Sequence, residues 1–462
     1  MNIPCYDLVI IGAGPAGMTA ASTASEYGLK VAILDEQATL GGQIYRSLSQ
    51  PTLVNESILG PDYYQGRALI SKIQKTKFDY LSSCTVWGVS SDLIVNFSCQ
   101  QKGRQIKAKK LLIATGAQER PAPFPGWTLP GVMTCGSAQI LLKSSGITPS
   151  GPLVIAGSGP LLLLIAAQLN RAGVEIKAIL DTTPKGRYIA ALPYLPKALK
   201  NLPILLKGMS LIAEIKQSDI PIYKQVSDLK AANSSQEKVD IVTFKQGNKA
   251  TSIPCETLLI HQGVVPNVQL SRALQLDHHW HELQHCWHPT LDQWGQTSHP
   301  DIFICGDAGG IAGAKAAAYL GELSALKVVQ TLKNLSSEKL KNLASTTVKK
   351  LNKESAIRPF LDALYRPDKY FLTPSDETLV CRCEEVSAKQ IRDMVALGCK
   401  GPNQTKAFSR AGMGPCQGRL CGLTVANIIA NERKVPVNHV GYYQVRSPIK
   451  PITISELTDL TE

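Results

Sequence analysis

The stretch that decides the fold is DLVIIGAGPAGMTAASTASEYGLKVAILDEQATLGGQ, residues 7–43. It opens with an apolar run of strand length and turns through a glycine-rich segment into a helical one. A second apolar run follows at residues 31–34. Strand, turn, helix and strand in this order predict a βαβ unit, in which a crossover helix joins two parallel strands. We therefore expect an α/β domain built around a parallel sheet.

The glycine-rich turn has the spacing of a dinucleotide-binding motif. Gly12 suits the tight turn, Gly14 lets the backbone approach a pyrophosphate, and Gly17 lets the helix pack against the strand. The N-terminus of the following helix offers free N–H groups and a partial positive charge to phosphates. We therefore expect a dinucleotide at this turn, and we include Pro15 and Ala16 among the residues that bind it.

Two acidic residues, Asp35 and Glu36, close the second apolar run. An acid about twenty residues after the glycines binds the ribose hydroxyls of an adenosine in such units. Asp35 ends the strand and is the preferred candidate, while Glu36 stays open as the alternative. The next turn, with Gly42 and Gln43, is flexible enough for a flavin ring to approach its backbone.

Two later strands are expected to end at the same site. An apolar run from residue 110 leads into a small-residue turn, and another from residue 301 leads into a Gly-Asp pair before a helix of small residues. Because ligands bind at the carboxyl ends of strands in open α/β sheets, both turns are predicted to contact the nucleotide. The candidate binding residues in these turns are Ala114, Thr115, Gly116, Gly306 and Asp307.

Residues 151–181 repeat the opening pattern. A strand, a turn with Gly157 and Gly159, a helix and a second strand ending in Asp181 follow one another. Leu162 replaces the third glycine, so the helix must pack more loosely on the strand. The pattern predicts a second dinucleotide-type domain and leaves open whether it binds a nucleotide or is a structural relic.

Composition narrows the class of protein. An apolar content of 44% and a charged content of 18% suit a globular chain, and 462 residues suit two or three domains. The net charge of +13 is scattered, so no nucleic-acid partner is expected. No apolar run of eighteen residues is unbroken, and no basic region precedes the first one. We therefore expect no transmembrane segment, no signal peptide and a cytoplasmic location, where twelve cysteines would not form a disulfide framework.

A basic, leucine-rich segment at residues 184–208 invites a further hypothesis. Lysines alternate with leucines there, as in helices that lie on a membrane surface. However, Pro193, Pro196 and Pro203 forbid one long amphipathic helix. We therefore favour a packed insert or a subunit contact, with peripheral membrane association as the alternative.

Four cysteines form the strongest chemical pattern after the opening. Cys381 and Cys383 make a CxC pair, and Cys416 and Cys421 make a CxxxxC pair. A helical hairpin that brings the pairs together would offer four thiolates to a [2Fe–2S] cluster or a zinc ion. The spacing is not that of a zinc finger, so we favour the cluster and keep structural zinc as the alternative.

With these pieces assembled, residues 1–330 resemble the flavoproteins of the pyridine-nucleotide-disulfide-oxidoreductase superfamily that have two dinucleotide domains. The strings at 35–37, 41–46, 114–121 and 412–419 are similar to those of one family within it. That family comprises the alpha (A) subunits of opine oxidases and D-hydroxyproline dehydrogenase and the B subunit of hydrogen cyanide synthase. The cysteine region resembles bacterioferritin-associated ferredoxin, which carries [2Fe–2S] but closes with CxxC rather than CxxxxC.

The resemblance implies an α/β fold with two Rossmann-like dinucleotide-binding domains, the second inserted in the first, and a small helical C-terminal iron–sulfur domain. It also implies that Asp307 binds the ribityl chain of the flavin. The expected FAD-binding domain comprises residues 1–145 and 262–332. The expected NAD(P)-type domain, linker and [2Fe–2S] domain comprise 146–261, 333–375 and 376–462.

The function that the resemblance implies is electron transfer within a heteromeric enzyme. A beta subunit flavoprotein of the amine-oxidase type would oxidise an amino acid or opine-type secondary amine, and electrons would pass through FAD and [2Fe–2S]. NAD(P), FMN at a subunit interface, and ATP are further cofactor candidates. No CxxC or CxxxxC pair lies in the first 330 residues, so thiol–disulfide chemistry is not expected, and no catalytic residue is identified.

Two other functions stay open. The first is a self-contained NAD(P)H-dependent FAD/[2Fe–2S] reductase, in which the Gly157 turn binds NAD(P)H and the cluster delivers electrons outward. The loss of the third glycine at this turn argues against it. The second is a structural subunit whose nucleotide serves only as a scaffold.

Overall fold

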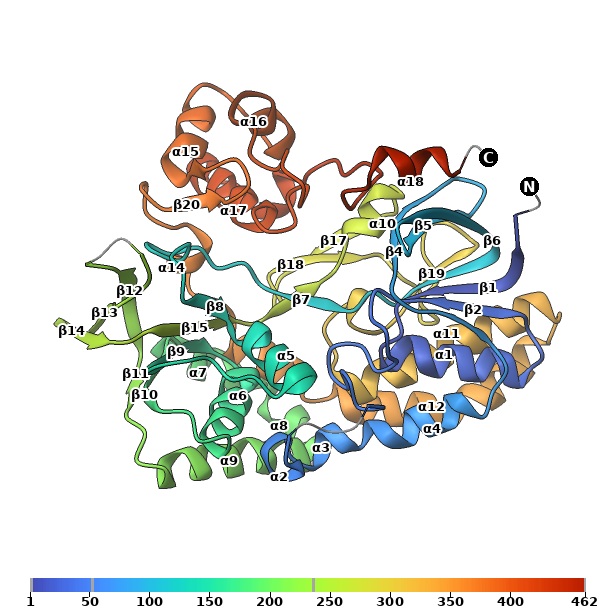
Figure 1. Cartoon of the computed structure of the whole chain (residues 1–462), viewed down its shortest axis with the longest axis horizontal. Coiled ribbons are helices and arrows are strands. Elements are labelled where there is room, and N and C mark those ends of the chain that lie inside the picture. The colour runs from blue at the N-terminus through green and yellow to red at the C-terminus, as the bar shows by residue number, and fades with distance from the viewer. Residues whose placement is uncertain (1–2, 51–53, 235–236, 461–462) are drawn as a thin grey trace.

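The computed structural model describes residues 3–50, 54–234 and 237–460 of the chain. The other positions of the expected domains, 1–2, 51–53, 235–236 and 461–462, lie outside the described residues. Two large sheets lie side by side, and a small helical unit with α15, α16 and α17 lies above them in the view of Figure 1. The α/β fold class expected from the sequence is confirmed.

The first sheet has seven strands in the order β3-β2-β1-β6-β5-β4, with β19 paired with β6. Its inner part is parallel, while β4, β5 and the first half of β6 form an antiparallel meander. β6 thus belongs to both the parallel and the antiparallel part of the sheet. The strands are β1 (Cys5–Ile11), β2 (Val31–Leu34), β3 (Asp79–Leu81), β4 (Cys84–Val89), β5 (Ile94–Cys99), β6 (Lys102–Ile113) and β19 (Ile302–Ile304).

Two helices cross closely against this sheet. α1 (Pro15–Glu26) and α11 (Ala314–Leu332) meet where Gly321 faces α1, and a Cβ on Gly321 would lie 2.1 Å from the carbonyl oxygen of Ala16. The contact therefore needs a glycine. The other helices beside this sheet are α2 (Glu56–Leu59), α3 (Pro61–Tyr64), α4 (Gly66–Gln74) and α12 (Ser337–Ser355).

The second sheet is parallel throughout, with strand order β11-β10-β9-β15-β8. β8 and α5 precede residue 146, yet they pack in this second unit, because β8 pairs with β15 and α5 covers the sheet. Its elements are β8 (Val132–Thr134), α5 (Cys135–Ser145), β9 (Leu153–Ser158), α6 (Pro160–Arg171), β10 (Ile176–Asp181), β11 (Ile222–Lys224) and β15 (Thr257–Gln262). A three-stranded antiparallel sheet lies beside it, with β12 (Val226–Ala232), β13 (Ile241–Gln246) and β14 (Lys249–Pro254).

Short strands join the two units. β7 (Ala117–Glu119) and β16 (Val264–Pro266) pair antiparallel where the chain crosses between the sheets in each direction. After β16 come α10 (Gln269–Ala273), which lies beneath α18 in Figure 1, and the hairpin of β17 (His278–His281) and β18 (Cys286–Pro289), which lies lower than the small helical unit. This crossing is the only described place where each unit donates one strand to a shared ladder.

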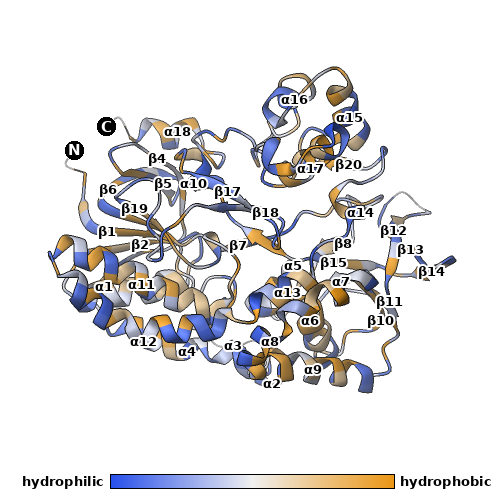
Figure 2. Cartoon of the chain, turned by 180° about the vertical axis from the view of Figure 1, so that it is seen from behind, coloured by the Kyte–Doolittle hydropathy of each residue, from blue (hydrophilic) through white to orange (hydrophobic). Residues whose placement is uncertain are grey.

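The proline-rich segment at residues 184–208 forms four short helices and the first part of a longer one, α9, along one edge of the second unit. Figure 2 shows hydrophobic and hydrophilic residues mixed along α9 at that edge. Several apolar side chains of the segment face solvent, among them Ile189, Leu192 and Leu199, which are 71%, 58% and 54% exposed. The prediction of a packed insert is therefore wrong for these side chains, and the subunit contact stays a prediction. The helices are α7 (Lys185–Ala191), η1 (Leu192–Tyr194), α8 (Leu195–Ala198), η2 (Leu199–Asn201) and α9 (Leu202–Gln217).

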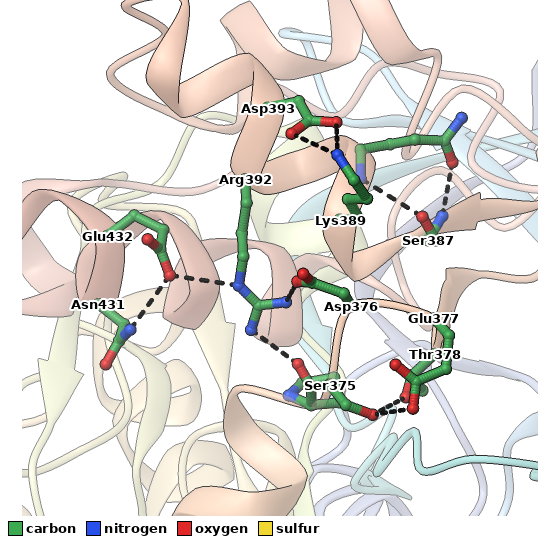
Figure 3. A network of polar contacts seen from close by, with 12 residues as sticks. Ser375, Asp376, Glu377, Thr378, Ser387, Lys389, Arg392, Asp393, Asn431 and Glu432 are labelled. Carbon is green, nitrogen blue, oxygen red and sulfur yellow. Dashed lines mark hydrogen bonds and ion pairs between the residues drawn. The ribbon is translucent and has the colours of Figure 1, made fainter.

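The C-terminal part forms the small helical unit and then returns to the first sheet. Arg392 ties the unit together, because its guanidinium contacts Asp376 at 2.6 Å and Glu432 at 3.2 Å (Figure 3). Beyond it, Val445 and Ile449 join the core of the first sheet. The elements are α13 (Arg358–Leu364), α14 (Lys369–Leu372), β20 (Leu379–Cys381), β21 (Val386–Ser387), α15 (Ala388–Ala396), α16 (Pro402–Ser409), α17 (Gly422–Arg433), η4 (Val437–His439) and α18 (Ile454–Thr458). Among the described helices, none has both the length and the apolar composition that crossing a bilayer requires.

Gly321 offers a direct test of the α1–α11 contact. We expect Gly321→Val to lower the melting temperature by several degrees, because a side chain would force the helices apart and overpacking costs about 1–3 kcal/mol. The matched control is Gly208→Ala in α9, where no atom lies within 4 Å of the added Cβ. This control should leave the melting temperature unchanged or raise it, since alanine favours a helix by about 0.5–1 kcal/mol. Thermal unfolding followed by circular dichroism decides, and equal effects of the two variants would contradict the packing account.

Candidate functional site

The first glycine turn is shaped by backbone contacts. Gly12 has φ +108°, and a Cβ on it would lie 2.4 Å from the carbonyl oxygen of Ala114 in the neighbouring strand. A Cβ on Gly17 would lie 1.9 Å from the carbonyl oxygen of Gly12. Side chains at these two positions would therefore push α1 off β1 and β6, so both glycines are needed by the fold itself.

Gly14 is different, because the space beside it is open. Gly14 caps α1 with no side-chain hydrogen bond and with φ −74°, and Pro15 occupies the first helical position. The nearest described atom to a Cβ on Gly14 would be the Cα of Gly42, at 3.9 Å. Uncapped N–H groups beside free space are what a bound phosphate requires. The turn therefore fits a pyrophosphate.

The two candidate acids, Asp35 and Glu36, contact different parts of the chain. The carboxylate of Asp35 accepts hydrogen bonds from the backbone N–H groups of Ala13 at 2.5 Å and Gln37 at 2.7 Å. Burial raises the pKa of Asp35 above its ordinary value. Glu36 instead forms an ion pair with Lys450 of the C-terminal segment at 2.7 Å. Asp35 thus holds the glycine turn in shape, while Glu36 faces the returning chain.

The Gly42–Gln43 turn lies against the glycine turn. A Cβ on Gly42 would lie 2.7 Å from the Cα of Gly14, so the two turns touch backbone to backbone. Lys143 of the second unit donates hydrogen bonds from Nζ to the carbonyl oxygens of Gln43 at 3.2 Å and Ile44 at 3.1 Å. Burial lowers the pKa of Lys143 to about 7. No local pattern revealed Lys143, because it lies 100 residues from Gln43 along the chain.

The carboxyl ends of β6 and β19 also lie at the start of α1. Gly306 lies against α1, since a Cβ on it would lie 2.8 Å from the Cβ of Ala16. Asp307 lies in η3 (Gly306–Ala308), and its Oδ1 accepts hydrogen bonds from the N–H groups of Ala312 at 2.8 Å and Gly313 at 3.0 Å. The carboxyl ends of β1, β6 and β19 therefore surround the start of α1, as the sequence predicts for an open α/β sheet.

The turn after β6 connects this site with the rest of the chain. Gly116 has φ +65°, and its carbonyl oxygen accepts a hydrogen bond from the N–H of Asn267 at 3.0 Å. Thr115 donates from its hydroxyl to the carbonyl oxygen of Asn267 at 3.4 Å. Both contacts fix the small-residue turn to the segment that leads into α10.

The second glycine turn has a similar backbone but different neighbours. Gly157 has φ +141°, and a Cβ on it would lie 1.9 Å from the carbonyl oxygen of His261. Gly159 caps α6 without a side-chain hydrogen bond. Nδ1 of His261 lies 2.6 Å from a carboxylate oxygen of Glu119. Leu162, in the place of the third glycine, is buried between α6 and the sheet. This turn also presents an uncapped helix N-terminus.

The four candidate cysteines come together as two pairs, and all twelve cysteines of the chain are unpaired thiols. The sulfurs of Cys383 and Cys416 lie 3.6 Å apart. A hydrogen bond from the thiol of Cys421 lowers the pKa of Cys381 to about 6, and backbone N–H groups add to the effect. Those N–H groups belong to Gly412, Glu384 and Cys383.

This pairing bears on the two metal hypotheses. Among the described residues, no group of three or more histidine, cysteine or acidic side chains has the geometry of a single-ion site. A zinc ion takes four ligands around one centre, whereas a [2Fe–2S] cluster spreads four thiolates over two irons. Two thiol pairs with backbone N–H groups beside their sulfurs are compatible with such a cluster.

Glycines and one tyrosine form the cradle of the cysteines. A Cβ on Gly414 would lie 2.2 Å from the Cβ of Cys383, and Gly412 and Gly418 lie against the ring of Tyr443. Tyr443 is buried, and its hydroxyl lies 4.0 Å from the sulfur of Cys421. The sequence placed the glycines near the cluster, but the tyrosine was not predicted because it follows 22 residues later.

The small helical unit is docked on the strands between the two sheets. Gln269 donates from Nε2 to the carbonyl oxygens of Cys416 at 3.3 Å and Gln417 at 3.0 Å. Gln118 donates to the carbonyl oxygen of Arg419 at 3.1 Å. Trp127 of the second unit donates from its indole to the carbonyl oxygen of Leu379 at 2.7 Å. Both larger units thus hold the cysteine unit in place.

Comparison with known families agrees with this division. The family described as "Pyridine nucleotide-disulphide oxidoreductase" matches residues 6–321, and the family described as "BFD-like [2Fe-2S] binding domain" matches residues 379–431. The first match covers both sheets, and the second covers the small helical unit, including the four cysteines.

Whole-length relatives carry related names. The chain is 42% identical to the A subunit of opine oxidase from Agrobacterium tumefaciens (strain Ach5), over 98% of this chain and 92% of that protein. It is 30% identical to the HcnB subunit of hydrogen cyanide synthase from Pseudomonas protegens, over 97% of this chain and 96% of that protein. The resemblance inferred from the sequence strings is confirmed.

A solved structure shares the fold. The crystal structure of L-proline dehydrogenase from P. horikoshii aligns with a TM-score of 0.73, over 99% of this chain and 80% of that one. The sequence identity is 19%, so this match supports the fold alone.

Gly14 separates nucleotide binding from folding. We expect Gly14→Ala to weaken FAD binding at least about tenfold, or about 1.4 kcal/mol, because the methyl group would fill the space left for the phosphate. The melting temperature of the flavin-free protein should stay within about 2 °C, since no protein atom lies in that space. Flavin content and calorimetric titration check this, with exposed Gly186→Ala as the control. Unfolding of the Gly14 variant would contradict it.

The four cysteines can be tested in the same way. We expect Cys381→Ser to abolish bound iron and sulfide and the visible absorbance of the cluster, because one ligand is lost. Cys399→Ser is the matched control, since Cys399 is also buried but lies outside the two pairs. Iron and sulfide analysis of the purified proteins measures the result. Full cluster content in the Cys381 variant would remove that residue from the ligand set.

Proposed function

The chain belongs to the pyridine nucleotide-disulphide oxidoreductase family, and from that premise we propose that it is the flavin and [2Fe–2S] electron-transfer subunit of a heteromeric dehydrogenase or oxidase. Its substrate is an amino acid or an opine-type secondary amine, oxidised mainly in a partner flavoprotein subunit of the amine-oxidase type. The names of the relatives, both of them subunits, support a role within a multi-subunit oxidoreductase.

One observation carries the proposal. Asn267 is bound to the turn of Gly116 at the first nucleotide site, and Gln269, two residues later, is bound to the carbonyl of Cys416. A single short segment therefore touches both candidate cofactor sites. Such a connection suits the passage of electrons between a flavin and a cluster, because it fixes the distance between them.

Each element of the chain has a role in this function. When bound, FAD supplies two-electron chemistry and [2Fe–2S] supplies one-electron transfer. The start of α1 would hold the pyrophosphate, and Asp35 would keep the glycine turn in shape for it. Asp307 would bind the ribityl chain, and the cysteine pairs would hold the cluster. Buried Tyr443 would shield the cluster from water on the side of the buried Cys381 and Cys421, while Cys383 is exposed.

The flavin turn itself lacks the dithiol of the disulfide reductases. Cys135, a cysteine of the second unit near these turns, is buried beside Glu119, and burial raises the pKa of its thiol well above the ordinary value. Such a thiol is a poor nucleophile. This supports a role in electron transfer rather than in thiol–disulfide exchange, with the substrate site in the partner. Twelve unpaired cysteines support a cytoplasmic location.

The second glycine turn supports an alternative function. Its uncapped helix start at Gly159 has room for a phosphate, as Gly14 does, so a self-contained NAD(P)H-dependent FAD/[2Fe–2S] reductase is the second candidate. Against it, Leu162 replaces the glycine that brings helix and strand together. The second turn has no part in the proposed electron transfer. FMN and ATP are further candidates for bound cofactors.

Affinity purification from the native host, followed by reduction assays, tests the function. We expect a second flavoprotein of the amine-oxidase type to co-purify in equal amount, because the substrate site is assigned to it. The visible spectrum of the complex should bleach on addition of an opine or amino acid and stay oxidised with NADH.

Two results of the same assays would contradict the role as an electron-transfer subunit. A chain that purifies alone and whose flavin is reduced by NADH or NADPH would replace the proposed function with the reductase. A flavin that stays oxidised with every reductant would favour a structural role. The Cys381→Ser variant is the control, since its flavin should still be reduced within the complex while electrons fail to pass onward.

A further inference from the structure

Arg272 in α10 is a cation without a counter-ion. Its guanidinium lies 4.7 Å from the ring centroid of Trp287 and 5.3 Å from that of Tyr442. Nε and Nη2 are buried and have no hydrogen-bond partner. Among the ion pairs formed by the described residues, none includes Arg272. The side chain therefore sits between two aromatic rings with its charge uncompensated by the protein.

The rings connect Arg272 to the cysteine unit. Tyr442 donates from its hydroxyl to the carbonyl oxygen of Gly418 at 3.4 Å, and a Cβ on Gly422, next to Cys421, would lie 2.5 Å from that hydroxyl. Gln269, one helical turn before Arg272, is bound to the carbonyl of Cys416. Arg272 is therefore connected through Tyr442 and Gln269 to the segment that carries Cys416 and Cys421, and it lies on the stretch of chain that leads from the first nucleotide site.

A second arginine lies near the same cysteines. Arg419 lies between Cys416 and Cys421 in the sequence and is half-buried; its Nη2 donates to the carbonyl oxygen of Ile449 at 3.5 Å, while its Nε is buried without a partner. Burial of a cationic group without a compensating charge is costly, and the cation–π contacts of Arg272 recover only about 1–2 kcal/mol of that cost. The unpartnered nitrogen atoms of Arg272, together with Arg419, indicate that an anion completes this part of the molecule.

A [2Fe–2S] cluster on four thiolates is that anion. Its net charge is two minus when both irons are ferric and three minus after one iron is reduced. A nearby buried cation lowers the energy of the more negative state by a larger amount, because Coulomb energies are strong where water is excluded. Nearby charge is one of the factors that set cluster potentials.

We propose that Arg272 is a tuning residue that raises the reduction potential of the cluster, so that the cluster accepts electrons from the flavin. In each transfer one electron leaves the reduced flavin, and one ferric ion of the cluster becomes ferrous. This inference deepens the proposed function and rests on it. Arg272 contacts neither substrate nor the reacting atoms, and it acts through its charge.

Redox titration of the purified holoprotein, followed by the EPR signal of the reduced cluster, tests the inference. We expect Arg272→Met to make reduction of the cluster about tenfold less favourable, which is about 59 mV for a one-electron couple. Arg272→Lys should stay close to the wild-type potential, because it keeps the charge. Lys389→Met is the control, since Lys389 is an exposed cation on α15 of the cysteine unit and is paired with Asp393.

The outcomes separate a charge effect from packing and from the cofactor assignment. An unchanged potential in Arg272→Met, or an equal shift in the Met and Lys variants, overturns the inference while the proposed function stands. If Arg272→Met fails to retain iron, Arg272→Gln replaces it in the titration. A cluster potential in Arg272→Gln equal to that in Arg272→Lys would then overturn the inference. Absence of a [2Fe–2S] EPR signal in the wild-type protein would instead overturn the cluster assignment.

Discussion

The rest of the structure depends on how closely backbones approach one another at the start of α1. Gly17 lets the helix lie on the strand, Gly12 admits the neighbouring strand end, and Gly321 brings α11 against Ala16. Because three elements meet there without side chains between them, the carboxyl ends of β1, β6 and β19 converge on one uncapped helix N-terminus. The space beside Gly14 is what remains open after this packing, and we propose that a phosphate binds there.

Very few residues connect the glycine turn at the start of α1 with the cysteine unit. Asn267 and Gln269 join the turn of Gly116 to the carbonyl of Cys416, and the paired strands β7 and β16 hold this segment between the two sheets. The cysteine unit is therefore not a freely tethered module. Gln118 from the first crossing and Trp127 from the second unit also bind it. Rigid placement of this kind is what fixed-distance electron transfer requires.

Much of this could be predicted from local pattern. The βαβ order, both glycine turns, the strand ends at Gly116 and Asp307 and the CxC and CxxxxC motifs follow from spacings of a few residues, which local backbone geometry dictates. In the tertiary structure, however, Cys383 lies beside Cys416 and Cys381 beside Cys421, so each spatial pair takes one cysteine from each motif. The segment at residues 184–208 shows the limit. Its prolines predict that no single long helix spans the segment, and α7, η1, α8 and η2 are indeed short, although α9 has 16 residues. Local pattern did not reveal that Ile189 and Leu192 would stay exposed.

The sequence by itself determined the fold class and the residue types at each site, because close backbone approach demands glycine and cluster ligation demands thiolates wherever they occur. Only the tertiary structure decided that Asp35 binds the glycine turn and that Lys143 binds the turn at Gln43. It also decided that Arg272 lies beside Tyr442 with two nitrogen atoms that have no partner. These contacts join residues far apart in the chain, so no short-range periodicity encodes them. They exist only after the two sheets and the helical unit have packed together.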